Sequence, residues 1–133
     1  MTALIDTNII IRHLTGDPAD QATAATQWLA AVDRVALVDL VVAETVYALE
    51  SYYRAPRPKV AASLRSLLAF EPVEVDDGAV LLRALELYEV ERLDFAEAYL
   101  VARAERDGAD VVSFDRAIDR VPTVRRVEPG SRQ

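Results

Sequence analysis

Two kinds of hydrophobic pattern alternate along the chain. Short apolar runs that stop at polar or turn residues predict buried strands; these runs lie at 2–5, 35–38, 73–75, 110–113 and 124–127. Longer segments with apolar residues at helical spacing predict helices; these segments span 7–14, 17–32, 40–53, 59–70, 77–90 and 94–106, with a short helix from Arg116. The alternation predicts an α/β fold with a short, mostly parallel sheet of four or five strands and helices on both faces.

Acidic and turn-forming residues mark where these helices begin and end. Asp39 is a candidate cap for the helix over 40–53, and Asp76 or Asp77 caps the helix that runs to about residue 90. The run Ala55-Pro56-Arg57-Pro58 breaks the chain, so the next helix is expected to begin at Lys59. Asp107-Gly108 ends the helix over 94–106.

Composition narrows the class of protein. The chain has 133 residues, of which 52% are hydrophobic and 28% charged, as in an ordinary globular domain. We expect one domain over 1–127 and a loose tail over 128–133. The chain contains no cysteine, which excludes disulfides and thiolate metal sites and agrees with a reducing cytosol. No stretch resembles a signal sequence or a membrane span, so we expect a cytoplasmic protein without membrane contact.

Acidic residues stand where two of the predicted strands end. Asp6 follows the first strand and Asp115 follows the strand over 110–113, each beside hydroxyl or amide side chains. Ligands of open α/β sheets bind outside the carboxyl ends of the strands, so these two carboxylates are expected to share one pocket. Glu44 and the pair Asp94 and Glu97 are further candidates for that pocket.

Each of these positions also has a purely structural interpretation. Asp6 and Asp115 precede helices and are possible caps. Asp94 and Glu97 form an Asp-x-x-Glu capping box, and for that pair alone the structural interpretation is the stronger one. Glu44 has no charged neighbour at helical spacing, so its carboxylate needs a partner from elsewhere, either a metal ion or an arginine.

Gathering carboxylates has an electrostatic consequence. Two carboxylates about 4 Å apart repel by about 4 kcal/mol at an effective dielectric constant of about 20. Either one carboxyl takes up a proton, or a divalent cation such as Mg²⁺ or Mn²⁺ binds between them. Metal-bound water is a nucleophile suited to phosphodiester hydrolysis. Polar side chains beside the aspartates are candidates to orient the waters or the phosphate; they are Thr7, Asn8, Ser113 and Arg116.

Four segments in this order resemble the PIN domain, and within that family the VapC ribonuclease toxins of type II toxin–antitoxin pairs. They are Leu-Ile-Asp-Thr-Asn at 4–8, Val-Val-Ala-Glu-Thr-Val-Tyr-Ala-Leu-Glu at 41–50, Leu-Asp-Phe-Ala-Glu-Ala-Tyr-Leu-Val-Ala at 93–102 and Ser-Phe-Asp-Arg at 113–116. The resemblance covers about residues 3–127. It implies a Rossmann-like fold, an endoribonuclease that requires Mg²⁺ or Mn²⁺, a homodimer, and a cognate VapB-like antitoxin that blocks the site.

The resemblance also implies roles for the acidic residues. Asp6, Glu44 and Asp115 match the first, second and last acidic positions of the family. Family members commonly have aspartate where this chain has Glu97, and Ser113 stands where many have threonine. The longer Glu97 keeps the carboxylate but extends it by one methylene, so Asp94, one turn earlier, is the alternative third ligand. The predicted metal ligands are therefore Asp6, Asp115 and either Glu97 or Asp94, with Glu44 ligating or orienting through water.

Other functions fit the sequence less well. A phosphoaspartate enzyme needs a lysine near the phosphoryl group, and Lys59 is poorly placed; a nucleotide-binding Rossmann domain needs a glycine-rich turn that the chain lacks. A PIN-like module that binds RNA or protein without cutting it is the serious alternative, because of the Glu97 departure. The single histidine, His13, and most of the arginines are expected to be surface residues, and Arg116 is the best candidate for phosphate contact.

Overall fold

The computed structural model describes residues 2–130, and its elements follow the predicted order of strands and helices. The strands are β1 Ala3–Leu4, β2 Val35–Ala36, β3 Val73–Glu74, β4 Val111–Val112 and β5 Arg126–Val127. The helices are α1 Thr7–Thr15, α2 Ala19–Ala31, α3 Asp39–Ser51, α4 Arg57–Ala69, α5 Gly78–Val90 and α6 Phe95–Asp107, with the 3-10 helix η1 Arg116–Arg120. The α/β class and its parallel strands are confirmed.

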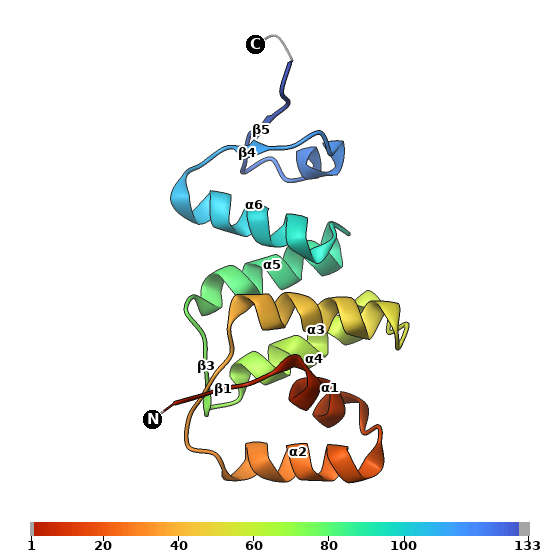
Figure 1. Cartoon of the computed structure of the whole chain (residues 1–133). Coiled ribbons are helices and arrows are strands. Elements are labelled where there is room, and N and C mark those ends of the chain that lie inside the picture. Colours follow the sequence, from red (N-terminus) through yellow and green to blue (C-terminus); the bar gives the residue numbers. More distant parts are fainter. Residues whose placement is uncertain (1, 131–133) are drawn as a thin grey trace. The chain divides into compact units, whose positions relative to one another are not determined.

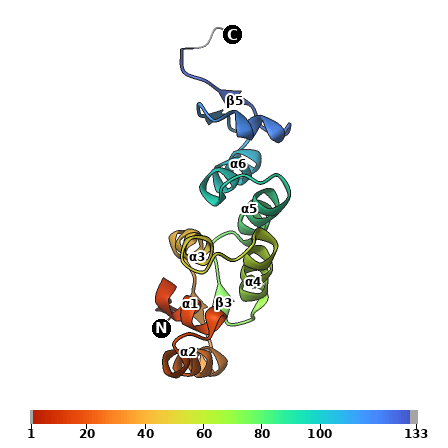
Figure 2. The same cartoon turned by 90° about the vertical axis from the view of Figure 1, so that its right-hand side faces the viewer.

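The chain divides into two units, residues 1–76 and 77–133. In unit 1, β1, β2 and β3 form a parallel sheet in that order, with Ala3 opposite Val35 and Val35 opposite Val73. Helix α1 lies between α2 and α3 in both views (Figures 1 and 2) and contacts both. The core beneath these helices includes the fully enclosed side chains of Ile10 and Val42.

In unit 2, α5 and α6 pack against each other along their lengths (Figure 1). Their core contains Leu81, Leu85 and Tyr88 from α5, and Tyr88 meets Phe95 of α6 edge to face at 6.3 Å between ring centroids. Strands β4 and β5 pair in parallel, with Val111 opposite Arg126, and β4 contacts α6. This packing places the end of β4 near the start of α6.

Aspartates cap three of the helices as their positions predict. Asp6 Oδ1 accepts from the Thr7 amide at 2.8 Å, Asp77 Oδ1 from the Val80 amide at 3.1 Å, and Asp94 Oδ1 from the Glu97 amide at 2.8 Å. These short acceptors satisfy amides that a helix leaves unpaired at its start. At the other end of α6, Gly108 takes a left-handed conformation with φ +64°, as a helix-ending glycine does.

The predicted starts of three helices are wrong. Helix α2 begins at Ala19 rather than Asp17, and Pro18 is its cap. Asp39 does not cap α3: Val38 holds the cap position, and Asp39 is the first helical residue, where its charge still suits the positive end of the helix dipole. Helix α4 begins at Arg57 rather than Lys59, because Pro58 falls in the first turn, where a missing amide hydrogen costs nothing. No helix within residues 2–130 is long and apolar enough to cross a membrane. Part of the predicted tail, residues 131–133, lies outside the described residues.

Candidate functional site

Asp6 stands at the point in unit 1 where β1 turns into α1. Its Oδ1 caps the helix, while its Oδ2 accepts a long hydrogen bond of 3.4 Å from the side-chain Nδ2 of Asn8. The Asp6 side chain is exposed. The helix cap therefore uses one oxygen and leaves the other open to solvent, so the structural and the metal-binding interpretations of Asp6 are compatible.

Glu44 is an exposed residue of α3 in unit 1. It lines a pocket of about 420 Å³ together with Thr7, Tyr47 and Tyr52. Thr7 belongs to the first turn of α1, and its Oγ1 is buried without a hydrogen-bond partner among the described residues. The packing of α1 on α3 thus brings Glu44 close to the residue that follows Asp6.

Three carboxyl groups come together in unit 2. Asp94 precedes α6, Glu97 lies in its first turn, and Asp115 follows β4 at the start of η1. Hydrogen bonds with Asp94 and Asp115, together with partial burial, raise the pKa of Glu97 to about 8. The same bond from Glu97, after the hydrogen bond from the Ala117 amide, lowers the pKa of Asp115. At neutral pH one proton is therefore held on Glu97 by its two acidic neighbours.

One carboxyl oxygen of Glu97, Oε2, is buried without a hydrogen-bond donor among the described residues. A buried acceptor without a donor is costly, and ionising the group makes the cost larger. A proton or a cation on the carboxyl would remove that cost.

The loop from β4 to η1 holds Asp115 in place. The Asp115 amide donates to Ser113 Oγ at 2.9 Å, and Asp115 Oδ1 accepts from the Ala117 amide at 2.9 Å. Arg126 in turn donates to the Ser113 carbonyl at 2.9 Å. Ser113 therefore positions the chain around Asp115.

The cations that act on Asp115 are Arg120 and Arg126, which both lower its pKa. From the sequence both are expected to be surface arginines, and Arg116 is the best candidate for phosphate contact. Arg116 is exposed and lowers the pKa of Asp119 instead. The sequence signal that could have identified Arg120 is its position on the same short helix that Asp115 begins. Arg126 comes from β5, so only the pairing of β4 with β5 brings it near.

The donor set of the unit 2 cluster suits a hard divalent cation. Carboxylate oxygens are the ligands that Mg²⁺ and Mn²⁺ prefer, and the orphaned Oε2 of Glu97 lacks only a positive partner. Among the described residues, however, no group of three or more acidic or histidine side chains is already arranged to hold a metal ion. The cluster fits the cation by its chemistry, and its side chains would have to adjust to bind it.

Asp6 and Glu44 belong to unit 1, and the other three carboxylates belong to unit 2. Within the units, the structure groups Asp94, Glu97 and Asp115, and it places Thr7 beside Glu44. The expectation that all five carboxylates share one pocket stays a prediction.

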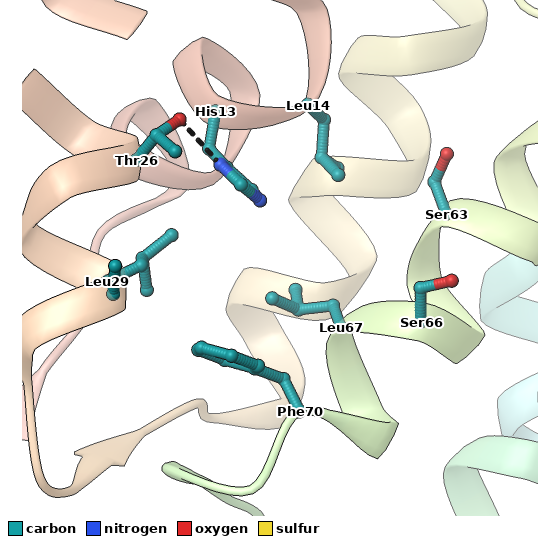
Figure 3. A pocket seen from close by; sticks show the side chains of 9 residues that line it. His13, Leu14, Thr26, Leu29, Ser63, Ser66, Leu67 and Phe70 are labelled. Carbon is teal, nitrogen blue, oxygen red and sulfur yellow. Dashed lines mark hydrogen bonds between the residues drawn. The ribbon is translucent and has the colours of Figure 1, made fainter. Parts of the chain in front are cut away.

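His13 differs from its expected surface position. It is half-buried, and its Nδ1 lies 2.8 Å from Thr26 Oγ1 (Figure 3). It lines a cavity of about 520 Å³ with apolar side chains that include Leu29, Leu67 and Phe70. No carboxylate lines this cavity, so His13 lies outside the candidate acidic site.

Comparison with known proteins identifies the family of this chain. A family model described as the PIN domain matches residues 3–124. A search of curated proteins found no match. Among solved structures, the chain is similar to one described as VapBC2 from Rickettsia felis bound to a DNA fragment from their promoter. That similarity has 16% sequence identity and a TM-score of 0.39, and it covers 96% of this chain and 98% of that chain.

Proposed function

Because the chain belongs to the PIN-domain family, whose members are typically metal-dependent nucleases, we propose that it is a Mg²⁺-dependent endoribonuclease. In this proposal it hydrolyses RNA phosphodiester bonds as the toxin of a toxin–antitoxin pair. Mn²⁺ is expected to substitute for Mg²⁺, since both accept carboxylate oxygens.

The observation that carries the proposal is the environment of Glu97. A carboxyl with a pKa of about 8, one orphaned buried oxygen and two acidic neighbours is costly as a purely structural arrangement. Perturbed carboxyls of this kind concentrate at functional sites. A divalent cation in place of the shared proton would ionise Glu97 and satisfy its Oε2.

One observation favours Glu97 over Asp94 as the third ligand: Glu97 Oε2 is buried and has no donor among the described residues. Asp94 Oδ1 accepts the Glu97 amide at 2.8 Å as the cap of α6, and this cap leaves its second oxygen for a cation, as at Asp6. We therefore propose Glu97 as the third ligand and keep Asp94 as the alternative.

We propose the following roles for the residues of the site. Glu97 and Asp115 of unit 2 would hold the cation, and the sequence predicts Asp6 of unit 1 as a further ligand. When bound, the cation supplies a water of lowered pKa and stabilises charge on the phosphate. Ser113 and the Ala117 amide keep Asp115 in position, and Arg120 and Arg126 keep it ionised. Glu44 is proposed to orient water, and Thr7, Asn8 and Arg116 to contact the substrate.

The partners are part of the same proposal. We expect a cytoplasmic homodimer and a cognate VapB-like antitoxin, encoded by an adjacent open reading frame, that inhibits the nuclease. Co-expression with that reading frame, followed by size-exclusion chromatography, measures whether a stable complex forms and whether it suppresses RNA cleavage.

The nuclease proposal is tested by cleavage of total bacterial RNA, which includes structured RNAs, with Mg²⁺, with Mn²⁺ and with chelator. We expect specific fragments only with metal, and their loss in Asp6→Asn. Asp33→Asn, at an exposed position away from the predicted ligands, is the matched control and should cleave as the wild type does. RNA or protein binding without any cleavage in the wild type would favour the non-catalytic alternative.

A further inference from the structure

Two tyrosines, Tyr47 of α3 and Tyr52 directly after the helix, expose most of their surface. Tyr47 is 63% exposed and Tyr52 is 78% exposed, although the opposite side of the helix buries Val42, Val46 and Leu49 in the core of unit 1. The two rings meet edge to face, with centroids 6.5 Å apart and an interplanar angle of 89°. Exposed aromatic side chains that are already ordered against each other are typical of binding surfaces.

These rings belong to a concave site. They line the pocket of about 420 Å³ that also contains Glu44 and Thr7, a volume in the range of small-ligand sites. The walls from Tyr47, Tyr52, Ala43 and Ala48 offer aromatic and aliphatic surface, while Glu44 and Thr7 offer polar groups. The pocket therefore suits a flat group with apolar faces and polar edges.

We propose that Tyr47 and Tyr52 form a stacking site for one base of a single-stranded RNA substrate, beside Glu44. This inference rests on the proposed nuclease function and deepens it by adding a substrate-positioning site. Single-stranded RNA is commonly recognised by stacking unpaired bases on tyrosine rings. A nucleobase is flat, with apolar faces and polar edges, as the pocket requires. Stacking a base on an uncharged tyrosine ring places no additional negative charge beside Glu44.

A second copy of this chain is the competing occupant, and charge argues against it. An interface centred on this pocket would bury Glu44, and a twofold interface would bury it twice. Burying a carboxylate without a paired cation is strongly unfavourable. A base leaves Glu44 partly hydrated and lets it accept a hydrogen bond from a base amino group.

Two exposed cationic side chains follow the pocket in the chain. Arg54 lies in the loop after α3 and Lys59 in the first turn of α4. Cationic side chains of this kind commonly contact phosphates and set the register of the strand. The stacking site would then hold a base while Arg54 and Lys59 contact the phosphates of the strand.

The test measures binding rather than cleavage. Fluorescence anisotropy reports the affinity for a labelled, uncleavable 2′-O-methyl oligonucleotide and for a matched strand of abasic residues, both with Mg²⁺. We expect the wild type to prefer the strand with bases. Tyr47→Ala should weaken that binding about 5- to 150-fold and reduce the preference over the abasic strand, whereas Tyr47→Phe should keep both.

Controls separate stacking from folding and assembly. Tyr53→Ala changes a nearby, 39% exposed tyrosine that does not line the pocket, and it should bind as the wild type does. Sedimentation equilibrium on each variant reports the oligomeric state. If Tyr47→Ala lowers the molecular mass, the face is an interface between copies and the stacking proposal is wrong.

The remaining outcomes distinguish this inference from the nuclease proposal. Equal affinity of the wild type for both strands, no RNA binding, or unchanged binding by Tyr47→Ala overturns the stacking site, even if Asp6→Asn still abolishes cleavage. Conversely, a stacking preference that depends on Tyr47 in a chain that never cleaves RNA supports this site and refutes the nuclease proposal.

Discussion

Replacing Glu97 by glutamine should make the protein more stable at alkaline pH. In the wild type, Glu97 must ionise beside Asp94 and Asp115 once the pH passes its raised pKa of about 8. Glutamine keeps the shape of the side chain, carries no charge, and has an amide that donates to either neighbouring carboxylate. The substitution therefore removes the repulsion while keeping the packing.

The magnitude follows from the shift of the Glu97 pKa. Each pKa unit corresponds to about 1.4 kcal/mol, so a change from 4.5 to about 8 sets an upper bound of about 5 kcal/mol. Asp94 and Asp115 are exposed, so solvent screens their charges, and we expect an effect of about 2 kcal/mol.

The sign follows from proton binding. Below pH 4.5 the folded and unfolded states both hold the Glu97 proton. Between pH 4.5 and about 8 only the folded state holds it, so wild-type stability falls as the pH rises, and the loss is complete above the folded pKa.

Urea unfolding at pH 5, 7 and 9, with chelator present, measures this effect. The free energy of unfolding of Glu97→Gln should match that of the wild type near pH 5 and exceed it by about 2 kcal/mol at pH 9. Glu71→Gln, at an exposed position in unit 1, is the control and should follow the wild type at every pH. Parallel pH profiles for Glu97→Gln and the wild type would refute the account of Glu97. Adding Mn²⁺ at pH 9 should stabilise the wild type more than Glu97→Gln.

Substitutions at three further positions test the structure of α6, one at its start and two near its end. Asp94→Ala should be about 1 kcal/mol less stable to urea than Asp94→Asn, because only asparagine keeps an oxygen to cap the Glu97 amide; equal stabilities would mean that the cap contributes nothing. Glu105→Gln should cost about 1–2 kcal/mol, since Glu105 accepts two hydrogen bonds of 2.9 Å from Arg83 and one from Thr123. Arg83 lowers the pKa of Glu105, so this cost should fade as the pH drops below the ordinary glutamate range, and a cost that persists in acid would contradict an ionic origin. Gly108→Ala should lower the free energy of unfolding by about 1 kcal/mol, since alanine is strained at φ +64° while no atom within 4 Å obstructs its Cβ, and no loss would show that the helix end adjusts freely.

Local signals predicted most of the secondary structure. Asp6, Asp77 and Asp94 cap helices, and Gly108 ends one, because a cap depends on residues within one turn. The errors at the starts of α3 and α4 have the same origin. Asp39 and Pro58 are compatible with either side of a helix start, and the packing of the rest of the helix decides which position they occupy.

Contacts between distant segments could not be predicted from the local pattern. His13 meets Thr26 because α1 packs on α2, although the sequence suggested only a surface histidine. Arg126 reaches the loop that holds Asp115 because β5 pairs with β4. Arginines are common on protein surfaces, so residue type alone does not indicate which arginines lie near the carboxylates.

The sequence by itself determined the α/β order of elements, the PIN family and the identity of the acidic residues, because these depend on residue type and short-range spacing. Only the tertiary structure decided the state of those acids. The pKa of Glu97 is raised by its neighbour Asp94 and also by Asp115, which lies 18 positions further along the chain and comes close because α6 and β4 pack together. A pKa depends on distance through space and on burial, and neither quantity is defined until the chain has folded.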